Sequence, residues 1–479
     1  MRHILGIDVG TTGTKCALFN EQGDLCDLES REYGLSYPMN GWVEQDPADW
    51  WGALCETVRA VLSRSGAAQT VTGLSLSTQG GALVLLDDAF EPLHPAVSWL
   101  DRRAGEIEEE LSRTISAEEL YGLCGWPLLG QLGFPTVCWF RERRPDLFKK
   151  ASYFASTVDY INRRLTGRFV IDCSNLALLE FLDIGRRGWS DKLMEIAGIG
   201  ERNVPPVVET GTLLAQLTPE AAEDLGLPEN VQVVSGAHDQ YCAALGAGAI
   251  RPGQCVLSCG TAWVLVLASE RIVADDRMLI YPGLHVPEKL YGLMTSVQSG
   301  GNALTWFRDG FLPGEEYEVL SGRAAGVEPG SGGMLFIPKG VTRSGKASFL
   351  GFDTAHTPDH FVRSVMEGVA FANRERLDAF RDLGLDIKSL VMIGGGARSP
   401  VWPHIVADIT GLPVSVPEQS ESACAGAAMI AGKGTGLFES YKEACACFLR
   451  GKRTVEPDAD NREVYARLYR RYSGFLEKH

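Results

Sequence analysis

The stretch Asp8-Val9-Gly10-Thr11-Thr12-Gly13-Thr14-Lys15 joins two short apolar runs, residues 3–7 and 16–19. A tight turn of Gly and Thr offers backbone N–H groups and hydroxyls at close range, which suits phosphate oxygens. A second turn, Cys259-Gly260-Thr261, also follows one apolar run and precedes another. Either turn alone could be an ordinary hairpin. Their repetition, one in each half of the chain, favours a duplicated fold that closes on one nucleotide.

Length and composition are typical of a soluble protein with at least two domains. The chain has 479 residues, of which 45% are hydrophobic and 22% charged, enough for more than one core. The chain has no apolar run of membrane-spanning length and no leader-like N-terminus, so we expect no membrane partner. A net charge of −16 argues against nucleic acid as a partner. The 12 cysteines contain no CxxC pair, which predicts reduced thiols and a cytoplasmic location.

Strand-like runs alternate with helical runs along the chain, which predicts an α/β fold. Small residues and breakers, Gly246-Ala247-Gly248 and Arg251-Pro252-Gly253, lie just before the second turn. We therefore predict two domains, residues 1–247 and residues 248–479.

Asp239 follows the strand-like run 231–235 and begins a helical run of small residues. At the carboxyl end of a sheet, where α/β proteins bind ligands, this carboxylate could be a general base. The alternative is a helix N-cap, a position that Asp fills well.

Two aromatic stretches with carboxylates allow two interpretations each. Gly41-Trp42-Val43-Glu44-Gln45-Asp46-Pro47, followed by Trp50 and Trp51, can line a sugar site or begin a helix with buried tryptophans. Trp99-Leu100-Asp101-Arg102-Arg103 can recognise a polyol or form a capped helix with a surface ion pair.

A strand-to-glycine-to-helix junction lies late in the chain, at Gly394-Gly395-Gly396-Ala397-Arg398-Ser399. Its glycines would let a flat ring or a phosphate approach the backbone. They would equally suit a crowded crossing between sheet and helix.

Taken in order, these motifs resemble the FGGY carbohydrate kinase family of the actin and sugar kinase superfamily. The resemblance covers essentially the whole chain. It rests on the two turns, Glu44 to Pro47, Trp99 to Arg103, Gly236 to Gly248, Met366-Glu367-Gly368-Val369-Ala370-Phe371 and Ile393 to Ser399.

The resemblance implies two ribonuclease H-like domains with a cleft between them, the N-terminal one for sugar and the C-terminal one for nucleotide. ATP would be the phosphate donor and Mg²⁺ its metal ion, with Asp8 organising the metal through water. Asp239 would take the proton from the sugar hydroxyl and, with Gln79, Gly80 and Asp101, bind the sugar. ATP phosphates would be held by Thr11, Thr12, Gly260 and Thr261, and the adenosine by Gly395, Gly396 and Ala397, with Asn302 nearby.

Departures from the family pattern affect the choice of substrate. Xylulokinases that resemble this chain carry a Met-His pair where it has Ser77-Thr78-Gln79-Gly80-Gly81, and a Gly-Glu-Arg segment is replaced by Gly340-Val341-Thr342-Arg343. We therefore expect an ATP-dependent kinase of a ketose or polyol, with pentuloses such as xylulose first, then a hexulose, gluconate or an erythritol-type substrate. Two further hypotheses are an actin-like or chaperone-like binding protein without catalysis, and a kinase-derived regulator. A homodimer would be compatible with each.

Overall fold

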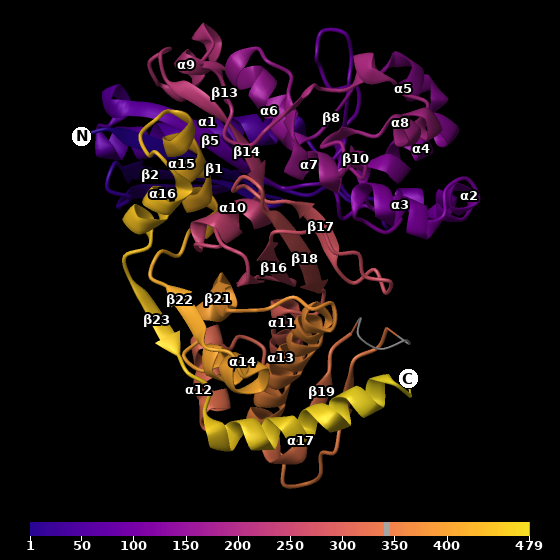
Figure 1. Ribbon diagram of the computed structural model, residues 1–479, viewed down its shortest axis with the longest axis vertical. Coiled ribbons are helices and arrows are strands. Elements are labelled where there is room, and N and C mark those ends of the chain that lie inside the picture. Colours follow the sequence, from indigo (N-terminus) through magenta and orange to yellow (C-terminus); the bar gives the residue numbers. More distant parts are fainter. Residues whose placement is uncertain (340–344, 479) are drawn as a thin grey trace. The chain divides into compact units, whose positions relative to one another are not determined.

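The computed structural model describes residues 1–339 and 345–478, and the chain packs into two units (Figure 1). The first unit consists of Met1–Ile250, Tyr281–Tyr291 and Glu421–Phe448, and the second of Arg251–Ile280, Gly292–Ser420 and Leu449–His479. Our prediction divided the chain once, at 247/248, whereas two later segments pack with the first unit. The departure at Gly340-Val341-Thr342-Arg343 lies outside the described residues.

A six-stranded sheet forms the centre of the first unit. Its order is β13 (Leu213–Gln216), β14 (Gln232–His238), β5 (Val71–Thr78), β1 (His3–Val9), β2 (Gly13–Asn20) and β3 (Leu25–Glu32). Strand β1 pairs antiparallel with β2 and parallel with β5, and β5 pairs parallel with β14. Strands β1, β5 and β14 are buried along nearly their whole length, as is usual for parallel strands whose two faces are covered.

The second unit repeats this strand pattern. Its strands follow one another in the order β18 (Tyr291–Val297), β16 (Trp263–Ser269), β15 (Gln254–Cys259), β21 (Ser389–Ile393), β22 (Val414–Pro417) and β23 (Lys452–Val455). Strand β15 pairs antiparallel with β16 and parallel with β21, as β1 does with β2 and β5. The two predicted turns therefore occupy the same place in two similar sheets, and the predicted α/β class is confirmed.

Helices and short strands complete the first unit. The helices are α1 (Pro47–Ser65), α2 (Glu108–Ser112), α3 (Ala117–Cys124), α4 (Gly133–Arg143), α5 (Pro145–Lys150), α6 (Thr157–Thr166), α7 (Cys173–Leu178), α8 (Asp191–Ala197), α9 (Pro219–Leu225), α10 (Asp239–Gly246), α15 (Ser422–Gly434) and α16 (Tyr441–Phe448). The short strands are β4 (Glu44–Gln45), β6 (Val84–Leu86), β7 (Ala96–Val97), β8 (Tyr153–Ala155), β9 (Ile171–Asp172), β10 (Leu182–Asp183), β11 (Gly188–Trp189), β12 (Val207–Val208) and β17 (Tyr281–Leu284).

Local signals in the sequence explain where α1 begins and ends. The Asp46 side chain accepts a hydrogen bond from the backbone N–H of Ala48, and Pro47 occupies the first turn. Gly66 ends the helix in the left-handed conformation, with φ of 66°. Trp50 and Trp51 are buried along α1, so of our two interpretations the helix with buried tryptophans is confirmed.

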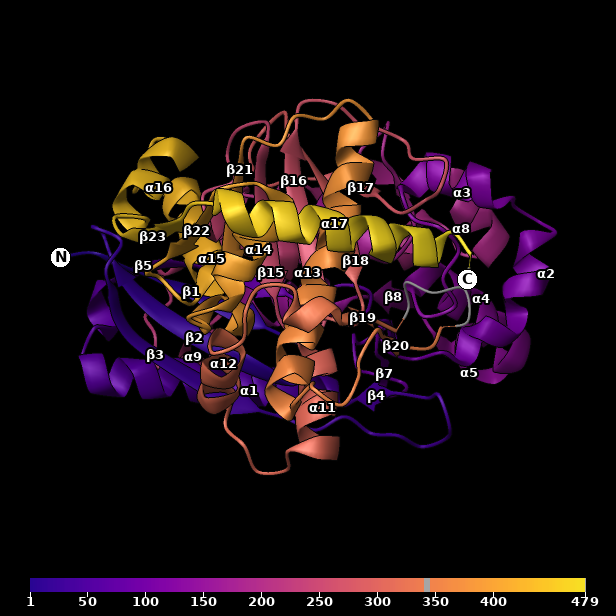
Figure 2. The same ribbon diagram turned by 90° about the horizontal axis from the view of Figure 1, so that it is seen from below.

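Helices α11 (Gly301–Phe311), α12 (Tyr317–Ala325), α13 (Pro358–Asp382), α14 (Trp402–Thr410) and α17 (Ala459–Leu476) belong to the second unit, with strands β19 (Leu335–Ile337) and β20 (Ser348–Leu350). Helix α17 lies across α13 in both views (Figures 1 and 2), and Phe371 of α13 contacts three tyrosines of α17, Tyr465, Tyr469 and Tyr472. This face of α17 therefore packs into the apolar core of the second unit.

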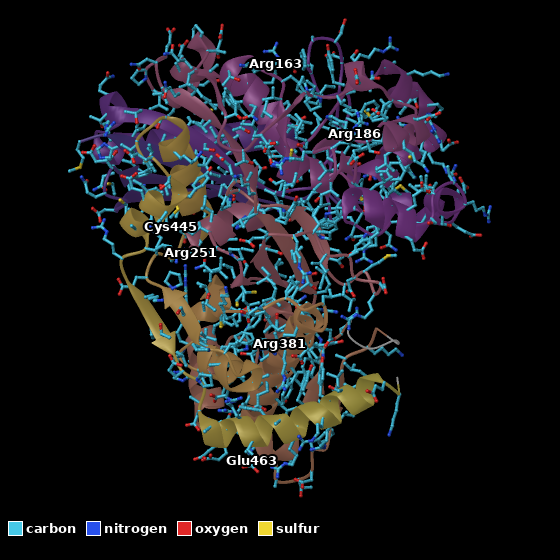
Figure 3. The ribbon with its side chains drawn as sticks, in the orientation of Figure 1. Arg163, Arg186, Arg251, Arg381, Cys445 and Glu463 are labelled. Atoms are coloured by element: carbon cyan, nitrogen blue, oxygen red, sulfur yellow. The ribbon has the colours of Figure 1, made fainter. Side chains whose placement is uncertain are left out.

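Charged side chains such as Arg186 and Glu463 lie at the surface of their own units (Figure 3). Within the part of the chain that the structure describes, no helix combines the length and the apolar character needed to cross a membrane.

Candidate functional site

Three parallel strands of the first unit end side by side and bring the predicted acidic residues to one edge. In the strand register Asp8 of β1 lies opposite Ser77 of β5, and Ser77 lies opposite Ala237 of β14. Asp239 follows β14 directly as the first residue of α10. Two carboxylates that are distant in sequence thus share the carboxyl edge of one sheet, where α/β proteins bind ligands.

Asp8 is a partly buried carboxyl with few protein partners. The Ser77 hydroxyl donates a hydrogen bond of 2.6 Å to its Oδ1. Burial, followed by the negative charge of Asp239, raises the pKa of Asp8 to about 7, against the lowering influence of Ser77 and Lys15. Lys15, opposite Asp8 on β2, forms an ion pair of 2.8 Å with Glu421. A cation next to Asp8 would therefore be electrostatically favoured.

Asp239 carries an unsatisfied acceptor atom. Its side chain is 29% exposed, but its Oδ1 is buried and lies 3.1 Å from His238 Nε2. Among the described residues, no group donates a hydrogen bond to this oxygen. Burial lowers the pKa of His238 to about 4 and raises that of Asp239 to about 6. His238 is therefore neutral near pH 7 and gives Asp239 no compensating charge. The N-cap of α10 is His238, so Asp239 does not occupy the capping position that we had considered.

Gln79 and Gly80 follow β5 at the same edge. The backbone N–H of Gln79 donates to the carbonyl of Val9, and its side-chain Oε1 is buried without a hydrogen-bond partner in residues 1–339 and 345–478. A Cβ on Gly80 would lie 2.6 Å from Leu178 Cγ and 2.7 Å from His238 Cδ2. Position 80 therefore requires glycine, because any side chain there would clash with Leu178 and His238.

Asp101 belongs to a buried ion-pair cluster rather than to a surface ion pair. Its two oxygens accept hydrogen bonds from the Arg103 side chain and from the backbone N–H groups of Val43 and Arg103. Arg103 also donates to Glu44 at 2.7 Å and stacks over the Trp42 ring, 3.9 Å from its centre. Asp101 is 1% exposed, and both of its carboxylate oxygens already accept hydrogen bonds from these protein groups.

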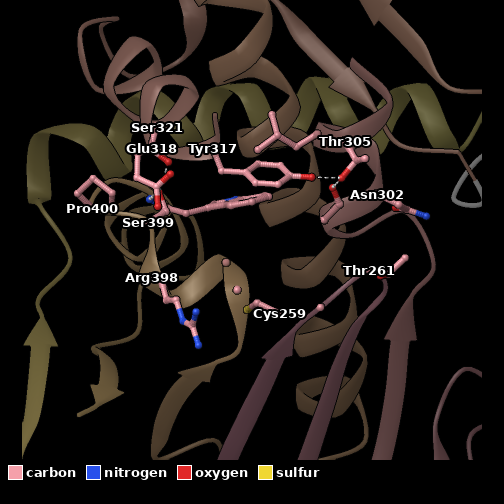
Figure 4. A pocket seen from close by; sticks show the side chains of 16 residues that line it. Cys259, Thr261, Asn302, Thr305, Tyr317, Glu318, Ser321, Arg398, Ser399 and Pro400 are labelled. Atoms are coloured by element: carbon pink, nitrogen blue, oxygen red, sulfur yellow. Dashed lines mark hydrogen bonds between the residues drawn. The ribbon is translucent and has the colours of Figure 1, made fainter. Parts of the chain in front are cut away.

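The second unit contains a cavity of about 370 Å³ at the second turn (Figure 4). Five residues that we assigned to nucleotide binding line it: Gly260, Thr261, Asn302, Gly395 and Gly396. The backbone N–H of Asn302 donates to the carbonyl of Thr261, and that of Gly301 to Gly260. The start of α11 is thereby fastened to the turn, which explains why Asn302 lies there.

The opposite wall of this cavity was not predicted from the sequence. The Tyr317 hydroxyl lies 2.7 Å from Thr305 Oγ1, and the Arg308 guanidinium lies 4.5 Å from the centre of its ring. Ser321 and Ser399 are hydrogen-bonded at 3.0 Å (Figure 4). Residues 317–321 form the first turn of α12, and no motif in the sequence marks them as lining a cavity.

The remaining predicted residues lie elsewhere. Ala397 packs into the apolar core of the second unit. Thr11 and Thr12 form the turn between β1 and β2 in the first unit, and the Trp99 indole donates to Thr11 Oγ1 at 2.9 Å. No group of three or more His, Cys, Asp or Glu side chains among the described residues is arranged to hold a metal ion.

Comparisons with known proteins match the whole length of the chain. Models of the FGGY family of carbohydrate kinases match twice, the N-terminal domain over residues 3–246 and the C-terminal domain over residues 255–434. A xylulose kinase of Bacillus subtilis is 32% identical, over 98% of this chain and 96% of its own length. A gluconokinase of the same bacterium is 28% identical, over 92% and 89%. The crystal structure of xylulose kinase from Rhodospirillum rubrum aligns with a TM-score of 0.93 at 30% identity, over 100% of this chain and 99% of that chain.

Proposed function

Because the chain belongs to the FGGY family of carbohydrate kinases, we propose that it transfers the γ-phosphate of ATP to a hydroxyl of a neutral ketose or polyol, with Asp239 as general base. A pentulose such as xylulose is the first candidate acceptor. The family, the two-domain α/β fold and the enzyme class that we predicted are confirmed. The hypothesis of a binding protein without catalysis is not supported, since the family phosphorylates sugars.

One observation carries the proposal: Asp239 Oδ1 is a buried carboxylate oxygen that accepts no hydrogen bond from the residues that the structure describes, at the sheet edge that Asp8 shares. An acceptor of this kind is costly to leave unsatisfied in the folded protein. A substrate hydroxyl would satisfy it. Burial also raises the pKa of Asp239 to about 6, which makes it a stronger base than an exposed carboxylate while it stays ionised near pH 7.

The proposed reaction moves one proton and one phosphoryl group. Asp239 takes the hydroxyl proton as the hydroxyl oxygen forms a bond to the γ-phosphorus. The bond from that phosphorus to the bridging oxygen breaks, and ADP leaves with the electron pair. Such transfers depend on positioning and on charge stabilisation more than on covalent help from the protein. A general base contributes about 10²–10⁴-fold.

Nucleotide binding is proposed for the cavity of the second unit. Gly260 and Thr261 offer turn amides and a hydroxyl to phosphate, and Gly395 and Gly396 let the nucleoside approach the backbone. Asn302 supports the turn, and phosphate binding is proposed for Thr11 and Thr12 as well. Because its side chain is in the core, Ala397 would contribute only its backbone.

A magnesium ion fits the donor set of the first unit. Mg²⁺ commonly binds one or two carboxylates, keeps several waters and takes its other ligands from substrate phosphates. Asp8 supplies a partly buried carboxylate beside the charge of Asp239, and no larger acidic cluster is needed. Asp8 would hold the ion through water, and the ion would supply positive charge to the phosphates.

The polarity of the first unit favours a neutral sugar over a sugar acid. Near the sheet edge, three buried oxygens accept no hydrogen bond from the described part of the chain: Gln79 Oε1, Asp239 Oδ1 and Gln240 Oε1. Hydroxyl groups can donate to such oxygens, whereas a carboxylate such as that of gluconate would be repelled. Arg103, a cation of this region, is already bonded to Asp101 and Glu44. Gly80 and the cluster around Asp101 would shape this site.

ADP release across a panel of sugars tests the proposal. The panel should contain xylulose, ribulose, erythritol, glycerol, a hexulose and gluconate, each with Mg-ATP. We expect turnover that depends on a neutral sugar. Hydrolysis of ATP at the same rate without sugar, or binding without turnover, would overturn the kinase proposal. Turnover with gluconate and no other compound of the panel would support the kinase activity but overturn the proposal that the acceptor is a neutral sugar.

A further inference from the structure

A chain of side-chain amides links the first turn to the candidate sugar site. Gln45 Nε2 donates a hydrogen bond of 2.7 Å to the backbone carbonyl of Thr11. Gln79 Nε2 donates one of 3.0 Å to Gln45 Oε1. Gln45 and Gln79 are 2% and 1% exposed, so neither amide exchanges these partners for water. Our sequence analysis quoted Gln45 within an aromatic stretch without assigning it a role.

The order of donors and acceptors along these hydrogen-bonded amides is fixed by the backbone carbonyl of Thr11. A backbone carbonyl can only accept, so Gln45 must turn its NH₂ group toward Thr11 and its oxygen toward Gln79. Gln79 must then turn its own NH₂ group toward Gln45. The remaining oxygen, Gln79 Oε1, is left buried and without a hydrogen-bond partner. The identity of that atom therefore follows from the hydrogen bonds and not from a free choice of amide orientation.

Both amides are held on rigid backbone. Gln45 belongs to β4, which pairs with β7 through Gln45 and Ala96. The backbone of Gln79 is bonded to Val9 at the end of β1. The turn itself is fastened a second time, since the Trp99 indole donates to Thr11 Oγ1. A free acceptor on such a support is preorganised for a donor that arrives from outside the protein.

We propose that Gln45 is a positioning residue that sets the polarity of the sugar site, by holding Gln79 with Oε1 free to accept one substrate hydroxyl. The inference rests on the proposed function. The site would then select at one carbon for a group that donates a hydrogen bond, and would discriminate against a sugar that lacks it. An unsatisfied buried acceptor carries a large penalty, and discrimination by a missing hydroxyl is correspondingly strong.

A comparison of deoxy sugars tests this role separately from stability. The neutral sugar with the highest kcat/KM in the panel is measured with the wild type, Gln45→Met and Gln79→Met. Each of its monodeoxy analogues that keeps the phosphorylated hydroxyl is measured with the same three proteins. The matched control is Asn162→Leu. Asn162 is also buried, with one amide bond to the carbonyl of Val170 and a free Oδ1, and lies on α6.

We expect the wild type to lose about 10- to 100-fold in kcat/KM when the hydroxyl at one carbon is removed. In both variants that loss should shrink to under about 3-fold. Gln79→Met removes the acceptor oxygen, and Gln45→Met removes the hydrogen bond that orients it. Asn162→Leu should lower the melting temperature and keep the wild-type pattern. Where Gln45→Met does not fold, Gln79→Met tests the same acceptor.

The inference would be overturned if folded Gln79→Met lost as much kcat/KM as the wild type on removal of each hydroxyl. It would also be overturned if the loss shrank in Asn162→Leu as it does in Gln79→Met. A wild type that discriminates at no carbon would also overturn it. Failure of the wild type to phosphorylate any neutral sugar is a different result: it removes the proposed acceptor class, and the inference with it.

Discussion

Gly426 and Cys242 lie so close that a Cβ on the glycine would be 1.9 Å from the carbonyl oxygen of Cys242. A Cβ on Gly246 would likewise lie 1.9 Å from the carbonyl oxygen of Ser422. Helices α10 and α15 are therefore in backbone contact at two points. Because α10 begins with Asp239, this crossing fixes the backbone that carries the proposed base.

Gly426→Ala should destabilise the first unit strongly. The clash is with backbone, which cannot rotate away, so we expect a loss of at least about 3 kcal/mol in the free energy of unfolding. The control is Gly52→Ala in α1, where a Cβ would meet nothing within 4 Å and should stabilise the helix by up to about 1 kcal/mol. Denaturant unfolding of both variants measures the difference. Equal stabilities would mean that the two helices do not touch in this way.

Asp239→Asn should slow phosphoryl transfer strongly and spare nucleotide binding. Asparagine keeps the size of the side chain but cannot take the hydroxyl proton, so kcat should fall by about 10²–10⁴-fold. Because the nucleotide cavity is lined by residues of the second unit, the dissociation constant for ADP should change less than about 3-fold. Single-turnover kinetics and calorimetric titration measure the two quantities. Near-normal turnover in a folded variant would remove Asp239 from the mechanism.

The activity should depend on pH through the same residue. Burial raises the pKa of Asp239 to about 6, and only the ionised form can accept a proton. We therefore expect kcat/KM for the sugar to be level above about pH 7 and to fall about tenfold per pH unit well below 6. The raised pKa also means that the contribution of this group to stability is present below about pH 4 and is lost as the pH rises through 6. Protonation of Asp239 at acid pH therefore favours the folded state. A kcat/KM that stays level down to pH 4 would contradict the role of Asp239 as base.

His285 should make the first unit sensitive to acid. Its Nε2 lies 2.7 Å from the carbonyl of Ala249, and burial lowers its pKa to about 4. A lowered histidine pKa contributes stability that is present above about pH 6.5 and is lost as the pH falls through 4, by about 3 kcal/mol in total. His285→Gln can still donate to Ala249 but does not titrate. Its free energy of unfolding should fall less than that of the wild type between pH 7 and pH 4, and parallel curves would refute this.

Much of the site could be predicted because it follows from local pattern. The two turns and the ends of β1 and β14 are marked by apolar runs that stop at Gly, Thr or Asp, and parallel strands then bring Asp8 and Asp239 to one edge. Gly395 and Gly396 are marked by the strand that precedes them. These signals are contained within a few residues of sequence.

Features that depend on contacts distant in sequence could not be predicted. The return of Glu421–Phe448 to the first unit is set by the close packing of Gly426 on α10, which no local signal announces. The burial of the Asp101–Arg103 pair depends on Trp42, and the role proposed for Gln45 depends on a carbonyl 34 residues earlier. In each case the feature depends on a contact with a residue far away in the sequence, and the type of the residue alone does not reveal that contact.

Neighbouring glycines of the nucleotide cavity should separate binding from stability. A Cβ on Gly395 would meet only the Cys259 carbonyl oxygen, at 3.8 Å, whereas one on Gly396 would lie 2.8 Å from Cys259 Cβ and 3.0 Å from the buried Trp263 ring. Gly395→Ala should therefore keep its stability within about 0.5 kcal/mol and weaken ADP binding by about tenfold, since the added methyl occupies the cavity. Gly396→Ala should lose about 1–3 kcal/mol of stability as well. Thermal melting and calorimetric titration measure both, and unchanged ADP binding in Gly395→Ala would place the nucleotide elsewhere.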